Sequence, residues 1–168
     1  YDTRFPASKY LDQLPELSVP RNYTVIRPES YRNWSECLAG NKYLKLLPGD
    51  YTSWGQIKTA VSGTEADPVI IRYADTSEVS AYKLRMTGRE AVVEGLKLEG
   101  VSNIIVTGIT IRGKGGEKNG VIGGMKSSIT NCKNIVLDFC NIENVAVSAI
   151  RMVNVTGCII QNCVFQQF

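Results

Sequence analysis

The stretch NIIVTGITI at residues 103–111 has two later counterparts, NIVLDFCNI at 134–142 and GCIIQNCVF at 157–165. The step from the first to the second is longer than the step from the second to the third. In this register four apolar columns line up, and a further run contributes Ile122 and then Ile150. The columns are Ile104–Ile135–Cys158, Val106–Leu137–Ile160, Ile109–Cys140–Cys163 and Ile111–Ile142–Phe165. A repeat of about 20 to 30 residues made of short Ile- and Val-rich runs predicts a solenoid of β-strands.

The spacing inside one repeat predicts how its strands pair. An i, i+2 pair such as Ile104 and Val106 points inward, the chain bends, and a second inward pair follows. The bend lacks the Asn-Gly turn that would close an antiparallel hairpin. We therefore expect each strand to pair with its counterpart one coil later, which stacks equivalent side chains. Asn103 above Asn134 is the expected amide ladder at a bend, and Cys140 is expected to stack on Cys163.

Residues 1–41 differ from this pattern. They contain four of the six prolines and have no sustained period, so they are expected to form an arm that ends in a short cap helix. That helix is predicted within 30–38, with Tyr31, Trp34, Cys37 and Leu38 on one face. Residues 42–168 then make about five coils. The apolar pattern is still running at Phe168, so we expect the coils to continue in a longer chain or to be completed by self-association.

Composition excludes several classes of protein. The chain has 168 residues, of which 43% are hydrophobic and 21% charged, as in a globular domain. No uninterrupted apolar run reaches the roughly 18 residues of a membrane-spanning helix. The net charge of +3 is small and scattered, which argues against nucleic acid as a partner. Histidine is absent, and this removes His-based catalytic pairs and His metal sites.

Cysteine usage does not indicate a disulfide scaffold. The five cysteines are an odd number, and no CxxC pair suggests zinc. Three of them lie within largely apolar runs, so the cysteines are predicted to be buried, reduced thiols that act as small hydrophobic residues.

Three segments together resemble a known superfamily. LLPGDYTSW at 46–54, SGTEADPVIIRYAD at 62–75 and VVEGLKLEGVSNIIVTGITIRG at 92–113 resemble the opening coils of right-handed parallel β-helix proteins of the pectate-lyase-like superfamily. Within it they are most similar to the alginate lyase and chondroitinase B family of polysaccharide lyases. The resemblance implies a right-handed parallel β-helix and β-elimination of an acidic polysaccharide, in which Lys takes a proton, Arg assists the leaving oxygen and calcium neutralises the carboxylate.

Several residues are candidates for such chemistry. Because no His is present, Lys and Arg must supply the base and the acid. The catalytic candidates are Lys126, Arg151 and Arg112, which adjoin predicted strands. Lys114, Lys118 and Asn119 are candidates for binding an anionic chain, and Asp138 and Glu143 for binding calcium. For the lysines and arginines, the alternative is a solvated charge on the surface of a solenoid.

Four aromatic residues near the start of the coils allow two interpretations. Tyr51, Trp54, Tyr73 and Tyr82 could stack on sugar rings, or they could pack against the open end of the solenoid. The second interpretation is the more common role of aromatic side chains at such an end.

The sequence leaves three functional hypotheses. The first is a carbohydrate-active β-helix, possibly a lyase, that acts on or binds an acidic polysaccharide. The second is a noncatalytic structural or adhesive β-helix, such as a segment of a phage tailspike or virion fibre. The third is a hydrolase of the polygalacturonase type, which ranks last because it needs several Asp residues in adjacent coils and only Asp138 is there. All three predict a location outside the cell, in the periplasm or on a virion surface.

Overall fold

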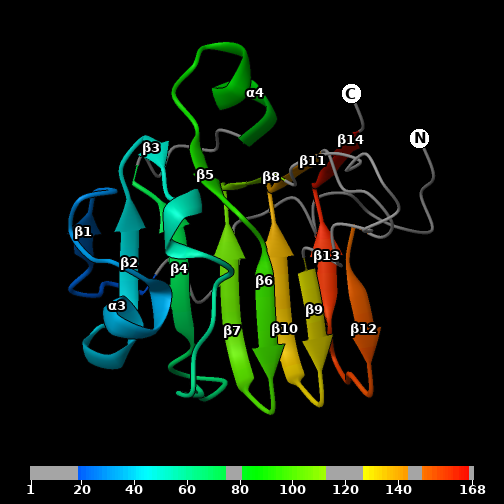
Figure 1. The fold of residues 1–168 in the computed structure, drawn as a ribbon. Coiled ribbons are helices and arrows are strands. Elements are labelled where there is room, and N and C mark those ends of the chain that lie inside the picture. Colours follow the sequence, from blue (N-terminus) through cyan, green and yellow to red (C-terminus); the bar gives the residue numbers. More distant parts are fainter. Residues whose placement is uncertain (1–18, 75–80, 113–126, 144–148, 167–168) are drawn as a thin grey trace.

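The computed structural model describes residues 19–74, 81–112, 127–143 and 149–166. In this part of the chain strands dominate, helices are few, and the strands pair in parallel (Figure 1). This confirms the predicted all-β class. None of the helices in these ranges is long and apolar enough to cross a membrane.

The strands form three parallel sheets. The six-stranded sheet has the order β1 (Thr24–Ile26), β2 (Tyr43–Leu46), β4 (Val69–Tyr73), β7 (Ser102–Thr107), β10 (Lys133–Asp138) and β13 (Ile159–Gln161). The five-stranded sheet has the order β14 (Val164–Gln166), β11 (Asn141–Glu143), β8 (Thr110–Arg112), β5 (Ala91–Val93) and β3 (Gly49–Asp50). The three-stranded sheet has the order β12 (Arg151–Val153), β9 (Ser127–Thr130) and β6 (Leu96–Glu99).

From β6 onward the chain visits the three sheets in a fixed order. β6, β7 and β8 belong to the three-, six- and five-stranded sheets respectively, and β9, β10 and β11 repeat the sequence. β12, β13 and β14 repeat it again. In Figure 1, β7, β10 and β13 lie side by side, coloured from green through yellow to red. Each strand therefore pairs with its counterpart one repeat later.

The registers of these pairings match the columns expected from the sequence. Ile135 pairs with Ile104, and Leu137 pairs with both Val106 and Ile160. The last column is confirmed as well, because Ile142 pairs with Ile111 on one side and Phe165 on the other. The inward-pointing residues of the two inner repeats are buried, since each is covered by a neighbour above and below.

The column expected from Ile122 and Ile150 is not the one that the third sheet contains. Ile122 lies outside the described residues, and Ile150 packs against the core just before β12. The strand that pairs with β12 is β9, which places Met152 opposite Ile129. Ile129 in turn pairs with Leu98 of β6, so this column consists of Leu98, Ile129 and Met152.

The corners between the sheets repeat with the same two steps as the apolar columns. Their residues share a left-handed backbone, with φ between about 51° and 72°. Gly and Asn are the residues that adopt this conformation most readily, which explains their spacing in the sequence. The expected amide ladder is present, because Asn134 Nδ2 donates to Asn103 Oδ1 at 3.1 Å. The three corner columns are Gly100–Asn131–Asn154, Asn103–Asn134–Gly157 and Gly108–Phe139–Asn162.

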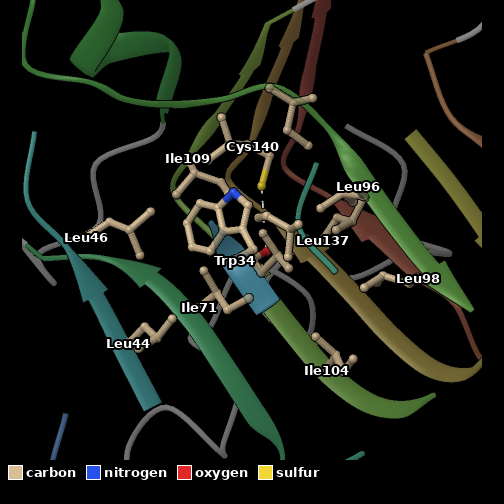
Figure 2. Close-up of a cluster of buried hydrophobic side chains, with 14 of the residues drawn as sticks. Trp34, Leu44, Leu46, Ile71, Leu96, Leu98, Ile104, Ile109, Leu137 and Cys140 are labelled. Carbon is tan, nitrogen blue, oxygen red and sulfur yellow. Dashed lines mark hydrogen bonds between the residues drawn. The ribbon is translucent and has the colours of Figure 1, made fainter. Parts of the chain in front are cut away.

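A short helix and an aromatic cluster cover the N-terminal end of the core. Helix α3 (Trp34–Gly40) begins after Asn33, whose side chain accepts a hydrogen bond from Glu36 N at 2.8 Å. Trp34 packs against Trp54, with ring centroids 4.7 Å apart, and against Tyr51. Trp54 belongs to a single 3₁₀ turn at Thr52–Trp54. Figure 2 shows the Trp34 ring among buried aliphatic residues. Of the four aromatic residues with two interpretations, Tyr51, Trp54 and Tyr73 are buried, as the packing interpretation predicted, whereas Tyr82 is 38% exposed.

The last repeat, β12 to β14, is covered much less. Met152 and Phe165 are 48% and 51% exposed, whereas their neighbours Ile129 and Ile142 in the preceding coil are 0% and 1% exposed. Among the strands that the structure describes, β12, β13 and β14 are each the outermost of their sheets. Within the described residues, the open side of these strands therefore carries exposed apolar side chains.

Candidate functional site

The five-stranded sheet carries a cluster of charged side chains around Glu143. The Glu143 side chain is fully buried and accepts from Arg112 Nε of the neighbouring strand. Arg85 Nε lies 2.8 Å from Glu143 Oε2 and comes from helix α4 (Ala81–Met86), which Figure 1 shows above the ends of these strands. Arg112 Nη2 also pairs with Glu90 Oε1. Two of the residues singled out from the sequence, Arg112 and Glu143, are thus in direct contact.

Amide side chains complete this cluster. Asn141 Nδ2 donates to Glu143 Oε2 at 3.0 Å, and Gln166 Nε2 reaches the same oxygen at 3.3 Å. Burial lowers the pKa of Arg112, but its hydrogen bonds and charge interactions with Glu90 and Glu143 outweigh that effect and raise it. Arg112 is therefore a permanent cation held between two carboxylates. The charges of the two arginines and the two glutamates balance. The cluster joins α4 to β8, β11 and β14 without adding net charge.

Asp138, the other candidate calcium ligand, belongs to the six-stranded sheet. It is 1% exposed and accepts from Asn162 Nδ2 at 3.0 Å. Burial raises the pKa of Asp138. Asp138 and Glu143 are bonded to different partners, and the described ranges contain no group of three or more acidic, Cys or His side chains that could hold a metal ion. Calcium binding stays a prediction.

The remaining candidates fall into two groups. Arg151 is exposed on β12, opposite Ser128 of β9, which is itself opposite Lys97 of β6. Lys126, Lys114, Lys118 and Asn119 lie outside the described residues.

A second cluster, which sequence reasoning missed, lies at the start of the six-stranded sheet. We call Arg21, Tyr23, Tyr43, Lys45 and Arg72 the cation–tyrosine cluster. The two tyrosine rings pack edge to face, with centroids 6.0 Å apart. Arg72 and Lys45 lie 5.3 Å and 4.9 Å from the Tyr23 ring, and Arg21 lies 5.5 Å from the Tyr43 ring. These are cation–π distances.

Among the described residues, positive charge exceeds negative charge around this cluster. Asp67 accepts from Lys42 Nζ at 2.6 Å and from Tyr43 Oη, and lies 3.9 Å from Arg21 Nε. The hydrogen bond from Lys42 is the main cause that lowers the pKa of Asp67, so this carboxylate is charged at neutral pH. One carboxylate thus faces Arg21 and Lys42, while Lys45 and Arg72 contact tyrosine.

Arg72 has hydrogen-bonding capacity to spare. Its side chain is buried, and its Nη1 reaches Tyr23 Oη at 3.5 Å. Its Nε is buried with no hydrogen-bond partner in the part of the chain that the structure describes. A buried donor without a partner is costly, and an anionic acceptor is the group that would satisfy a guanidinium best.

A hollow adjoins this cluster through Lys42. It has a volume of about 220 Å³ and lies between the end of α3 and β4. Its lining is Leu38, Ala39, Gly40, Asn41, Lys42, Thr59, Val61 and Val69. Apolar walls beside a lysine and a row of cations suit a ligand with flat apolar faces and negative charges.

A signal for the cation–tyrosine cluster was present in the sequence. In KYLKLL (42–47), Leu44 and Leu46 alternate with Tyr43 and Lys45, so the latter two share the opposite face of the strand. Arg72 of VIIRY (69–73) lies on the same face, because it is opposite Lys45 in the register of β2 and β4. What sequence could not supply was the partner from the arm, Tyr23, whose position depends on the pairing of β1 with β2.

No family model, curated protein or solved structure matches this chain.

Proposed function

We propose that the three sheets are the faces of one right-handed parallel β-helix and that this domain binds an acidic polysaccharide. Two observations support the solenoid. The chain passes through the three sheets in the same order in each repeat, and the apolar columns and the corner residues repeat with the same two sequence steps. The segments that resemble the alginate lyase and chondroitinase B family support the ligand class.

The observation that carries the binding proposal is the cation–tyrosine cluster. An acidic polysaccharide presents carboxylate or sulfate groups at regular intervals, together with the apolar faces of its sugar rings. Arg72 and Lys45 supply charges for the anionic groups, and Tyr23 and Tyr43 supply aromatic surface for the rings. The hollow beside Lys42 extends the same surface toward α3.

Calorimetric titration with uronate oligosaccharides tests this proposal, with neutral oligosaccharides of equal length as the reference ligand. Lys45→Glu reverses a half-buried charge in the cluster and should weaken uronate binding by about fivefold or more, the effect of roughly 1 kcal/mol. Lys97→Glu makes the same change on the exposed face of β6 and should leave binding within about twofold. Equal affinity for neutral and acidic ligands, or equal effects of the two variants, would overturn the proposal.

Cleavage by β-elimination is the catalytic form of this proposal. Arg112 is already bound by Glu90 and Glu143, so Lys126 and Arg151 are the proposed base and acid. Cleavage yields an unsaturated sugar that absorbs in the ultraviolet, and Arg151→Gln should abolish that signal while uronate binding persists. If wild-type protein binds uronate but forms no unsaturated product, with or without added calcium, the domain is a binding module and not a lyase.

The open side of the last coil favours a second candidate function, that of a structural or adhesive β-helix. Met152 and Phe165, which continue inward-pointing columns, are both exposed there. A fibre segment would use this surface for assembly, so sedimentation should show a larger species that Phe165→Glu converts to monomer. A wild-type chain that stays monomeric at high concentration argues against this role.

A further inference from the structure

Two of the five cysteines occupy equivalent positions in successive coils. Cys140 directly precedes β11 and Cys163 directly precedes β14. Asn141 is opposite Val164 in the register of these two strands, and Val164 N donates to Cys140 O at 2.9 Å. The two cysteines are therefore direct neighbours across the pair of strands.

The spacing of parallel strands suits a covalent link at this place. Neighbouring strands lie about 4.7–4.9 Å apart, and disulfides join residues whose Cα atoms are about 4.4–6.8 Å apart. Both side chains face the core, because Cys140 is buried and Cys163 packs against the core cluster. Their thiols lie within hydrogen-bonding reach of one another. Each sulfur also lies near the backbone carbonyl oxygen of the residue two positions before it, at 3.4 Å for Cys140 and 3.2 Å for Cys163.

The two thiols differ in access and acidity. Cys140 is covered on both sides by other coils, whereas Cys163 belongs to the last coil and is only half buried. The hydrogen bond from Cys140 lowers the pKa of Cys163, and the same bond, together with burial, raises the pKa of Cys140. Cys163 is thus the thiol that a reagent meets first and that ionises more readily.

We infer that Cys140 and Cys163 form a disulfide that joins the last coil to the one before it when the protein meets a small-molecule disulfide such as oxidised glutathione. The Cys163 thiolate attacks one sulfur of the reagent, breaking its S–S bond and releasing one glutathione thiolate. Cys140, after losing its proton, then attacks the Cys163 sulfur and releases the second glutathione. The two cysteines are oxidised, one reagent molecule is reduced to two thiols, and the two cysteine protons leave with these thiols.

In the described ranges, no other two cysteines occupy equivalent positions in successive coils. The counterpart of Cys132 one coil later is Val155, and Cys37 lies on α3. Cys158 stands at the position of Ile135 in the preceding coil. The arrangement is thus particular to one pair, and Cys132 and Cys158 serve as internal controls.

The test is thiol counting on the full chain before and after treatment with oxidised glutathione. Free thiols, alkylated after denaturation, should fall from the five of the sequence to three, and non-reducing peptide mapping should recover one cross-linked peptide that joins Cys140 to Cys163. The cross-link should raise the melting temperature by about 5–10 °C. Reduction with dithiothreitol should reverse both changes.

Three variants separate this disulfide from other outcomes. Cys140→Ser should stop at a stable glutathione adduct on Cys163, and Cys163→Ser should lose both the cross-link and the adduct. Cys158→Ser should behave as wild type. The inference is overturned if treated wild type keeps five thiols, if it carries a stable adduct on Cys163, or if the peptide map joins any other pair of cysteines. None of these outcomes depends on polysaccharide binding, so the two proposals fail separately.

Discussion

The two ends of the parallel sheets differ in what covers them. At the N-terminal end, α3 and the cluster of Trp34, Tyr51 and Trp54 lie over the core, and all three aromatic side chains are buried. At the other end, Phe165 occupies the same column as Ile111 and Ile142 but is half exposed. An inward-pointing position in such a stack is therefore buried only when something lies on both sides of it.

The energetic consequence is a gradient of stability along the stack. A buried aromatic residue at the covered end contributes packing on all sides, whereas an apolar residue of the last coil contributes packing on one side only. Local opening should therefore begin at the last coil. Substitutions at the two ends and at the corner between the last two coils probe this gradient.

Replacing Trp34 should disrupt the covered end. Trp34→Ala leaves a large cavity beneath α3 and should lower the free energy of unfolding by about 3–5 kcal/mol. Phe165→Ala removes an aromatic side chain that is half exposed at the other end. It should lower the free energy of unfolding by about 1 kcal/mol or less. Urea unfolding of both variants measures the difference. Equal losses would mean that the last coil is as tightly packed as the first.

Gly157 tests whether the corner of the last coil is firmly seated on its neighbour. Its φ is +70°, and a Cβ there would lie 2.5 Å from Asn134 Oδ1. Gly157→Ala combines backbone strain with this clash and should cost about 2–3 kcal/mol. Gly100 has a similar φ of +64° but open space around it, so Gly100→Ala should cost only about 1 kcal/mol. A Gly157→Ala variant as stable as Gly100→Ala would show that the corner at Gly157 can move away from Asn134 without cost.

Substitution of Asp138 should change the free energy of unfolding less than the substitutions of Trp34 or Gly157, and the change should depend on pH. Burial raises its pKa in the folded protein, so folding favours the protonated carboxyl. The stabilisation from the protonated form is complete below the unfolded pKa of about 3.9 and is lost as pH rises through the folded pKa. Asp138→Asn keeps the acceptor for Asn162 and should be slightly more stable than wild type at pH 7, an advantage that shrinks in acid. Thermal unfolding at both pH values measures this, and a variant that is less stable at pH 7 contradicts it.

Much of the fold follows from local spacing. The columns and the asparagine ladder are confirmed, because each depends on contacts between a residue and its counterpart one repeat away. The helix expected within 30–38 is observed at Trp34–Gly40, so Tyr31 precedes it, while Trp34, Cys37 and Leu38 share its buried face as predicted. The predicted run of Ile122 and Ile150 is not a column of the described strands, because Ile122 lies outside the described residues and Leu98, Ile129 and Met152 form the column of this sheet. The segment between β8 and β9 is longer than the segment between β11 and β12, and a repeat cannot be aligned through such an insertion.

The candidate sites could be predicted from residue spacing to a smaller extent than the fold. Arg112 was predicted to be catalytic and Glu143 to bind calcium. The sequence did not indicate that the two side chains pair. Their pairing, and the arrival of Arg85 from α4, depend on contacts between residues that are far apart in the sequence. The cation–tyrosine cluster likewise joins the arm to two strands.

Sequence alone was enough to predict the all-β class, the unequal steps of the repeat and the amide ladder at one corner, and to exclude histidine chemistry. These depend on the preferences of single residues and on the two-residue period of a strand. The contacts of Tyr23 with both Lys45 and Arg72, and the greater access to Cys163 than to Cys140, became visible only in the folded chain. The physical reason is that charge balance and exposure belong to the set of neighbours around a side chain, and the stacking of coils selects those neighbours.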